Sequence, residues 1–527
     1  MKKSLFVWAA ALMTLAACSN NDELLNNENP DGKVTVTATL PNGAPDSRVA
    51  LTEDNTNAAA PAIKVAWETE ESFSVIRGSE NKTFSKNVEG STFTGDVHTV
   101  TDGTYYAFYP ATEATATNAI PYDLSQQTGT MDEAKTYMYA KNGTDGLNYE
   151  FKHLTALVKF TLTLPDGASG VTPSKVVISS DGLLAKSTVD LTGEDVVYST
   201  EANTATSITV TTTSLTFYAY VNPMTASGED KNKFVISMDG NDGNYYSGTL
   251  ETSVSINANY LYAATVSMIK VEKGDYAMAD GSFMKYDAGV TLTTAQKANV
   301  RGIVFWTTAD SNSSGTTPAK LTDDEIMKAD YPHCTHGLIV ALKDVSKDTK
   351  WQEHAINIAA WQTNTFEAEN KEKYKSIASN EDDTTAPIRY ILGYQNTKLL
   401  KAYNAQCEEN YEVLPVSLLA DFETTHPAPA NTTGWFIPSV KELRMLIYKD
   451  DDNLNSSSDS YNDTKLVVNA SLQKVDSDIL SNQNCWSSLE KEWSDHSTAY
   501  FFDFYYVAKG YSMKTSNSKS VRAVCAY

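Results

Sequence analysis

Cysteine is almost absent from the first half of this chain. Of the five cysteines in 527 residues, one is Cys18, and none follows until residue 334. The remaining four are Cys334, Cys407, Cys485 and Cys525. Six of the eight tryptophans also lie beyond residue 300. Because both residue types change in frequency together, we expect two modules with a joint near residues 268–275.

An excess of positive charge is also lacking. The chain has 42 Lys and Arg against 66 Asp and Glu, so its formal net charge is −24. An acidic surface repels a phosphate backbone, which argues against nucleic acid as a partner. Long hydrophobic runs are missing too. The apolar run from Leu5 to Leu15 is too short for a permanent transmembrane helix, and no other segment approaches that length.

The N-terminus has the order of a secretory signal. Lys2 and Lys3 precede the apolar run, and small residues precede Cys18. Residues 15–18, LAAC, resemble a bacterial lipobox, which implies that residues 1–17 are removed and that Cys18 is acylated. The alternative is that the signal is cleaved as in an ordinary secreted protein and that Cys18 has no role in it. Residues 18–32 are polar and are expected to form a flexible tether.

The region 33–270 has the alternation of β-strands. In residues 33–40, Val34, Val36, Ala38 and Leu40 alternate with Lys and Thr, and similar patterns recur up to residue 268. Asp-Gly and Asn-Gly turn signals separate these segments. The sequence therefore predicts a mainly β fold here, a β-sandwich made of two sub-sandwiches that divide near residue 167.

Several segments of this region, in order, resemble the fimbrillin-like lipoproteins, the pilus subunits of Bacteroidota. These are VAWETEESFSVI (65–76), GTYYAFYP (103–110), LSQQTGT (124–130) and FKHLTALVKFTL (151–162). The resemblance implies an outer-membrane lipoprotein precursor that reaches the cell surface and is trimmed after an Arg. Trimming removes the first strand, and a strand from another fimbrial subunit replaces it by donor-strand exchange.

Arg48 is the candidate processing site. It ends the Gly- and Pro-containing segment PNGAPDSR that follows the expected strand 33–40. Such a loop is exposed and accessible to a protease. The alternative is that Arg48 is an ordinary surface charge.

The region 271–527 combines apolar strands with helical stretches, and we expect an α+β domain. Residues 302–306 and 336–342 are predicted buried strands. Ser439 and Glu442 form a capping-box pattern, and the following apolar residues are predicted to lie on one helical face.

Three segments of this region resemble C-type-lectin-like and formylglycine-generating-enzyme-like domains. They are GWFIPSVKELRML (434–446), CWSSLE (485–490) and VRAVCAY (521–527). Four cysteines in an exported chain predict two disulfides. The resemblance favours the pairs Cys334–Cys525 and Cys407–Cys485, because lectin-like domains tie the closing strand to an early element; Cys485–Cys525 is the alternative.

No catalytic residue, metal ligand or cofactor is assigned, and we expect no enzyme. His333 and His336 lack a second ligand pair at zinc spacing. The acidic segment 449–463 lacks EF-hand spacing and favours a solvated loop over a Ca²⁺ site. Formylglycine-type chemistry needs reactive thiols, and paired cysteines are the simpler expectation.

The aromatic stretch 484–504 is predicted to be mainly a β-hairpin. A strand is expected over residues 499–507. Trp493 lies alone in the polar segment of the stretch and is the candidate for stacking on a ligand such as a sugar.

The expected function is that of a fimbrial subunit. The sequence given ends at Tyr527, directly after the predicted closing strand, so we expect no donor strand and a place at the fimbrial tip. The C-terminal domain would then bind a glycan or a host or bacterial surface protein. The alternative is a non-polymerising surface-anchored lipoprotein that binds glycan or protein.

Overall fold

A computed structural model provides the fold, and its contacts group the chain into two compact units. Unit 1 contains residues 1–122, 133–155 and 187–202, and unit 2 contains residues 123–132, 156–186 and 203–527. The structure describes residues 32–40, 52–54, 62–64, 67, 70–88, 90–131, 135–142, 146–227, 231–310, 320–366, 374–380, 386–448, 463–492 and 497–527.

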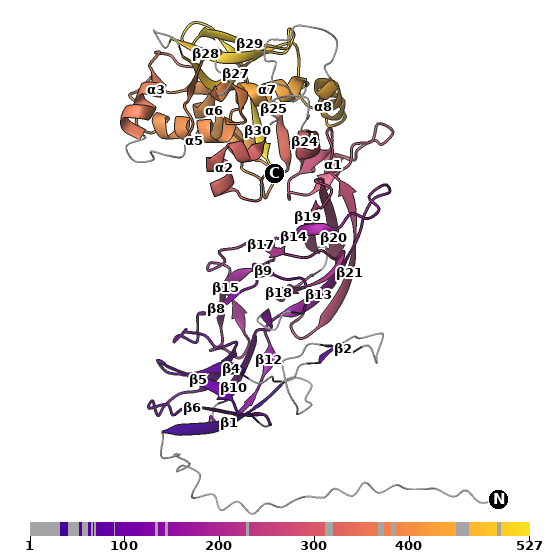
Figure 1. Ribbon diagram of the computed structural model, residues 1–527, viewed down its shortest axis with the longest axis vertical. Coiled ribbons are helices and arrows are strands. Elements are labelled where there is room, and N and C mark those ends of the chain that lie inside the picture. Colours follow the sequence, from indigo (N-terminus) through magenta and orange to yellow (C-terminus); the bar gives the residue numbers. More distant parts are fainter. Residues whose placement is uncertain are drawn as a thin grey trace, which may run out of the picture. The chain divides into compact units, whose positions relative to one another are not determined.

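Unit 1 is built on an eight-stranded sheet with the order β11-β1-β6-β5-β4-β7-β10-β12 (Figure 1). In chain order its strands are β1 (Lys33–Thr39), β4 (Ser72–Arg77), β5 (Glu80–Lys86), β6 (Thr92–Asp96), β7 (Tyr105–Tyr109), β10 (Met138–Asn142), β11 (Asn148–Glu150) and β12 (Lys152–His153). A two-stranded sheet joins β2 (Thr52–Asp54) to β3 (Ala62–Lys64). A three-stranded sheet contains β8 (Ile120–Asp123), β15 (Lys186–Asp190) and β16 (Val197–Tyr198).

Unit 2 begins with a second eight-stranded sheet, ordered β18-β13-β21-β20-β19-β14-β17-β9. Its strands are β9 (Gln126–Gln127), β13 (Ala156–Thr163), β14 (Pro173–Ser179), β17 (Ser207–Val210), β18 (Thr216–Val221), β19 (Asn232–Gly240), β20 (Tyr245–Thr252) and β21 (Leu261–Lys270). Phe160 lies at the centre of its core, with ring centroids 5.6 Å from Phe217 and 6.1 Å from Phe234. The alternation seen in the sequence therefore places these rings on a buried face.

The rest of unit 2 is an α+β region around a nine-stranded sheet. The strand order is β23-β22-β24-β25-β30-β27-β28-β29, and β26 pairs with β27. The strands are β22 (Tyr276–Met278), β23 (Phe283–Met284), β24 (Val300–Thr307), β25 (Gly337–Thr349), β26 (Ala378–Ser379), β27 (Asn484–Lys491), β28 (Thr498–Asp503), β29 (Ala508–Met513) and β30 (Lys519–Ala526). The C-terminal strand β30 thus lies inside the sheet.

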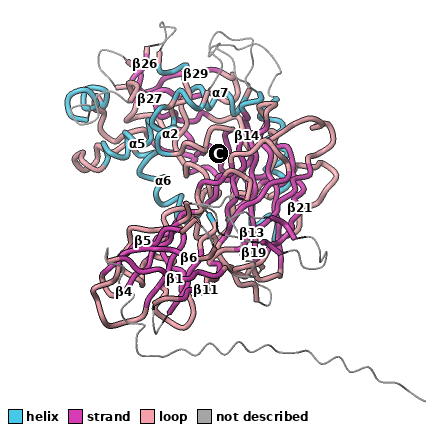
Figure 2. The backbone as a smooth tube through the Cα atoms, turned by 60° about the horizontal axis from the view of Figure 1, so that its bottom comes forward, coloured by secondary structure: helices cyan, strands magenta, loops and turns pink. Residues whose placement is uncertain are grey.

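Helices flank this sheet (Figure 2). They are α1 (Thr294–Asn299), α2 (Glu325–Asp330), α3 (Ile358–Trp361), α5 (Gly393–Asn404), α6 (Leu414–Thr425), α7 (Val440–Ile447) and α8 (Asp463–Lys474). Short helical turns are η2 (Thr308–Asp310), η3 (Leu321–Asp323), the π-helical η4 (Gln362–Phe366) and η5 (Pro387–Arg389). Buried side chains of α7 and α8 join one hydrophobic cluster, and those of α5 and α6 join another. The alternating residues of β30 divide between the two clusters, so the sheet has a core on each face.

The predicted fold class is confirmed: the structure is mainly β, with an α+β region at its C-terminal end. The domain limits 33–270 and 271–527 stay a prediction. The capping box of Ser439 and Glu442 is present at the start of α7. The apolar residues Val440, Leu443, Leu446 and Ile447 are buried in one hydrophobic cluster, and the polar residues of α7, including Lys441 and Arg444, are buried as well. Strands of the C-terminal sheet, α8 and η5 contact this helix.

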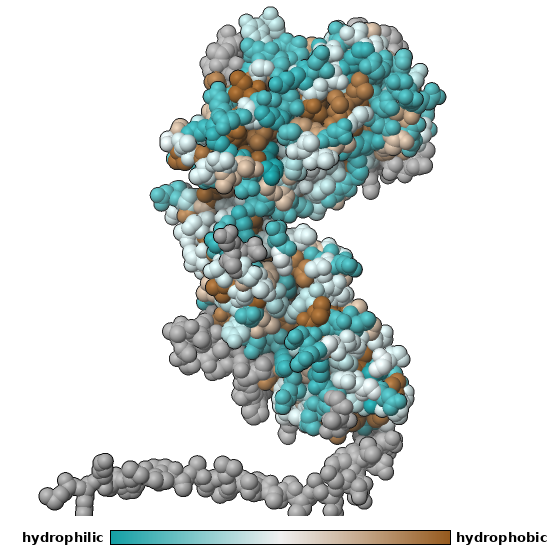
Figure 3. All heavy atoms as spheres, turned by 180° about the vertical axis from the view of Figure 1, so that it is seen from behind, coloured by the Kyte–Doolittle hydropathy of each residue, from teal (hydrophilic) through white to brown (hydrophobic). Residues whose placement is uncertain are grey.

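The strand expected over residues 499–507 is shorter than predicted. β28 ends at Asp503, whose Oδ1 accepts the backbone N–H groups of Tyr505 and Tyr506 at 2.8 and 2.9 Å. This bonding closes a turn, and both tyrosines are exposed. Hydrophilic and neutral residues cover most of the molecular face in Figure 3, and hydrophobic residues gather in a few places on it. Within the described residues, no helix is both long and apolar enough to cross a membrane.

Candidate donor-strand site and ligand-binding residues

The first strand of unit 1, β1, is bonded along both edges. It pairs antiparallel with β6, where Val36 lies opposite Phe93, and parallel with β11, where Thr37 lies opposite Asn148. The amide of Thr37 donates to the carbonyl of Leu147 at 2.8 Å. A strand at this position satisfies backbone groups on two neighbours, so its removal would open a gap between β6 and β11.

The inward side chains of β1 and the residue after it belong to the core of unit 1. Val36, Ala38 and Leu40 are 1%, 0% and 9% exposed. The indole Nε1 of Trp67 donates to the carbonyl oxygen of Ala38 at 2.9 Å. The centroid of the Trp67 ring lies 4.9 Å from that of Phe93. β1 therefore covers an aromatic core and supplies the acceptor for a buried indole.

Aromatic rings surround Trp67 on several sides. Its centroid lies 5.4 Å from both Tyr109 and Phe151, in edge-to-face geometry. Phe73 continues the cluster, 4.8 Å from Phe93 and 5.1 Å from Phe151. These rings belong to strands or loops on both sides of β1, so their burial depends on the strand that occupies this position.

The side chains on the outward face of β1 contribute little to holding this strand in the sheet. Thr35 Oγ1 lies 3.2 Å from Thr94 Oγ1, and Lys33 Nζ lies 2.8 Å from Asp96 Oδ1. Both side chains of this ion pair are exposed, and such pairs contribute about 0–1 kcal/mol. Backbone pairing and the alternate inward side chains therefore define what this position requires: an extended segment with small or branched apolar residues at every second place.

Three predicted site residues lie outside the described residues: Cys18, Arg48 and Trp493. Residues 449–462 of the acidic segment do so as well. Lipidation, processing at Arg48 and ligand stacking by Trp493 therefore stay predictions.

The predicted disulfides are not formed. The structure has Cys334, Cys407, Cys485 and Cys525 as free thiols. Cys334 and Cys485 pack in the cluster that contains α7, whereas Cys407 and Cys525 pack in the one that contains α6. Each favoured pair, Cys334–Cys525 and Cys407–Cys485, therefore joins residues of different clusters.

The alternative bridge Cys485–Cys525 is excluded by strand register. Cys485 is aligned with Ser520 in the parallel pair of β27 and β30, so Cys525 lies five residues further along. At about 3.3 Å per residue the two Cα atoms are about 16 Å apart, whereas a disulfide requires less than about 7 Å. Burial raises the pKa of both Cys334 and Cys485 to about 12, which makes these thiols unreactive.

A buried ion pair was missed in the sequence. Glu490 and Lys514 have fully buried side chains and contact each other directly. Glu490 Oε2 also accepts the amide of Ala359 at 3.0 Å, and Lys514 Nζ donates to the carbonyl of Ile356 at 2.7 Å. The sequence suggests a polar, turn-like segment over residues 489–498, but β27 continues to Lys491. The pair connects β27 to the segment that leads into α3.

Two buried carboxyl groups in the same region bind the first turn of α5. Asp324 Oδ2 accepts the amide of Gln395 at 2.8 Å, and Glu442 Oε1 accepts the amide of Gly393 at 3.3 Å. Both amides lie in the first turn of α5, which has no side-chain cap of its own. Burial raises the pKa of Asp324 to about 6 and that of Glu442 to about 8. With these bonds, the carboxyl groups serve as caps for α5.

Of the two histidines considered as metal ligands, His336 contacts side chains of unit 2. His336 Nε2 lies 3.3 Å from Asp239 Oδ1, and its ring stacks on Tyr245 with centroids 4.4 Å apart. Burial lowers the pKa of His336 to about 4. No group of three or more His, Cys, Asp or Glu side chains suited to a metal ion occurs in the described part of the chain.

Comparison with known proteins gives matches to fimbrial and adhesion proteins. A putative fimbrium tip subunit, Fim1C, from Bacteroides ovatus is 30% identical over 228 residues, which are 42% of this chain and 39% of that protein. The chain thus spans well under half the length of this relative. A solved fimbrial protein from Bacteroides ovatus covers 93% of this chain and 99% of its own, with 18% identity and a TM-score of 0.43.

A putative cell adhesion protein from Bacteroides uniformis covers 46% of this chain and 98% of its own. Its identity is 19% and its TM-score is 0.30. The family model described as fimbrillin-like matches residues 47–280. The fimbrillin-like resemblance is thereby confirmed for residues 47–280 of this chain.

Proposed function

We propose that this chain is an adhesive subunit of a cell-surface fimbria and that it receives a strand from another subunit at the position of β1. The observation that carries the proposal is the double pairing of β1 between β6 and β11, above the aromatic core around Trp67. A replaceable strand in this position uses main-chain bonds for affinity and alternate side chains for specificity.

Cleavage after Arg48 is the step that would release β1. The bond after Arg48 lies C-terminal to the whole of β1 and to Leu40, so cleavage separates every residue of that strand from the rest of unit 1. The lipid on Cys18 would leave with the same segment. Before cleavage the lipid anchors the precursor in the outer membrane, and afterwards the donated strand holds the subunit in the fimbria.

The tip is the proposed place of the subunit. β30 pairs with β25 on one side and β27 on the other, and its residues are nearly all buried. A strand held in this way is committed to its own sheet and is unsuited to donation. The name of the Bacteroides ovatus relative, a putative fimbrium tip subunit, supports the same place. The C-terminal α+β region would then carry the adhesive surface.

Sequencing the N-terminus of protein purified from surface fimbriae tests this function. The expected first residue is Val49, without acyl groups. A matched Arg48→Ala precursor should keep its lipid and be absent from fimbriae. Fimbriae that contain an acylated chain beginning at Cys18 would contradict strand exchange at β1. An acylated chain found in the outer membrane and in no fimbria would favour the non-polymerising lipoprotein.

A further inference from the structure

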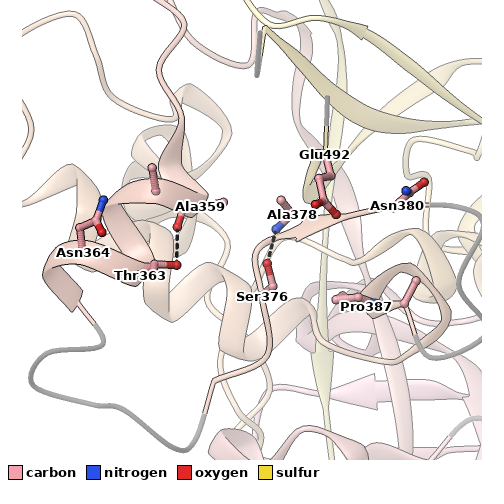
Figure 4. A pocket seen from close by; sticks show the side chains of 10 residues that line it. Ala359, Thr363, Asn364, Ser376, Ala378, Asn380, Pro387 and Glu492 are labelled. Atoms are coloured by element: carbon pink, nitrogen blue, oxygen red, sulfur yellow. Dashed lines mark hydrogen bonds between the residues drawn. The ribbon is translucent and has the colours of Figure 1, made fainter. Parts of the chain in front are cut away.

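A cavity of about 590 Å³ opens on the C-terminal α+β region between two walls (Figure 4). Thr363 and Asn364 belong to the helical wall, made by α3 and η4. Ser376 and Asn380 flank β26 on the strand wall, and Glu492 follows β27. The volume lies within the range of about 300–1,000 Å³ that is usual for small-ligand sites.

The buried Glu490–Lys514 pair supports the helical wall through hydrogen bonds to α3. Glu490 accepts the amides of Ile358 and Ala359 at 3.3 and 3.0 Å, which fixes the first turn of α3. A fully buried ion pair is seldom more stabilising than well-packed apolar residues, because both charges must be desolvated. We therefore attribute to this pair a positioning role: it sets where α3 lies relative to β27.

A second link joins the two walls directly. The buried side chain of Gln362 accepts the amide of Ile377 at 2.8 Å and donates to the carbonyl of Lys375 at 3.2 Å. Gln362 also begins the π-helical turn η4, a conformation that is rare and is frequent at functional sites. On the strand wall, Glu492 N donates to the carbonyl of Ser379 at 3.0 Å. The cavity is consequently formed before any ligand enters.

The lining has the chemistry of a hydroxyl-binding site. Within the described part of the chain, the side chains of Asn364, Asn380 and Glu492 have no hydrogen-bond partner, and all three are exposed. Asn364 on the helical wall, and Asn380 and Glu492 on the strand wall, offer donors and acceptors suited to hydroxyl groups, each of which both donates and accepts (Figure 4). Alanines and Pro387 supply apolar surface between these groups.

Charge narrows the ligand class. The described lining residues include one carboxylate and no Lys or Arg, in a chain of net charge −24. Anionic ligands such as sialic acid, sulfated sugars or phosphates would lack a counter-charge here. We propose that this cavity binds a neutral saccharide unit, whose hydroxyl groups bond to Asn364, Asn380 and Glu492. This inference rests on the adhesive role proposed above and assigns that role a site.

Saturation-transfer NMR and calorimetry on the full chain, with neutral hexoses and N-acetylhexosamines as probes, test the proposal. At least one neutral sugar should bind saturably with a dissociation constant in the millimolar range. Asn364→Ala and Glu492→Ala should each weaken binding about fivefold or more, since each removes one hydrogen-bonding group. Thr365→Ala, an exposed change on the same π-helical turn outside the lining, should bind as the unmodified chain does.

Three outcomes would overturn the saccharide site: no saturable binding of any neutral sugar, equal binding by the lining variants, or tighter binding of sialic acid than of neutral sugars. Asn380→Ala provides a second lining variant on the opposite wall if Asn364→Ala perturbs η4. The N-terminus and fimbrial incorporation of each variant report on strand exchange separately, because β1 belongs to the other unit. Failure of the sugar site would leave those two readouts unchanged.

Discussion

Replacing Val36 by Asp should destabilise unit 1 by about 4 kcal/mol or more. Val36 is 1% exposed and lies opposite Phe93 in the pairing of β1 with β6. The change loses about 1.5–3 kcal/mol of apolar burial, and a buried carboxylate without a partner costs a few kcal/mol more. The carboxylate faces the aromatic rings around Trp67 and would have to take up a proton or leave the core.

Hydrogen exchange measured strand by strand is the appropriate assay. A loss of about 4 kcal/mol should accelerate exchange of the most protected amides in β6 and β11 by about a thousandfold. Thr35→Asp, on the exposed face of the same strand, should change exchange by less than about threefold. The strands of the C-terminal sheet provide an internal reference. Equal exchange in the two variants would refute the assignment of β1 to the core.

Three further predictions concern buried charge, pH and thiols. Lys514→Met should destabilise unit 2 by about 3–5 kcal/mol in denaturant unfolding, because it leaves Glu490 buried without its cation. Adding Glu490→Gln to this variant should recover part of the lost stability. If the losses from the two substitutions simply add, the pairing of Glu490 with Lys514 is contradicted. Burial lowers the pKa of His153 to about 4, below its unfolded value of about 6.5, so its contribution is present above pH 6.5 and is lost as pH falls towards 4. Thermal unfolding between pH 7 and pH 4 should therefore show a steeper decline than in His153→Asn, and parallel curves would refute this. With Cys18 replaced by Ser, denatured non-reduced protein should titrate four thiols, and Cys407 should react fastest in the native state; a titre near zero would restore the disulfide prediction.

The strands with strict alternation could be predicted from the sequence. In β1, Val36 and Ala38 are buried as the period-two pattern indicated, and in β13 the same holds for Val158 and Phe160. Patterns of this kind are local, because one buried face and one exposed face are enough to produce them. The capping box of α7 is local too, since its two side chains are three residues apart.

Features that depend on distant residues were missed. α5 buries the polar residues Gln395 and Asn396, so its sequence lacks the regular spacing of apolar residues from which an amphipathic helix is predicted. Glu490 and Lys514 each resemble surface residues when considered alone, and their burial depends on a contact across 24 positions.

The pairing of the cysteines could not be derived from the sequence, for a related reason. Export favours disulfides as a class, but whether two thiols share a core is set by the register of β27 and β30 and by the side of the sheet on which each packs. The pattern of cysteines along the chain does not contain that information. The lining of the saccharide cavity likewise comes from three separate segments, joined only by the fold.

The central claim is that unit 1 accepts a foreign strand in place of β1, and strand complementation tests it most directly. A chain that begins at Val49 should bind a synthetic peptide with the sequence of residues 33–40, and binding should restore the exchange protection of β6 and β11. A peptide with Asp at the positions of Val36 and Ala38 is the matched control and should not bind. A truncated chain whose β6 and β11 are fully protected without peptide, or which binds both peptides equally, would contradict the account.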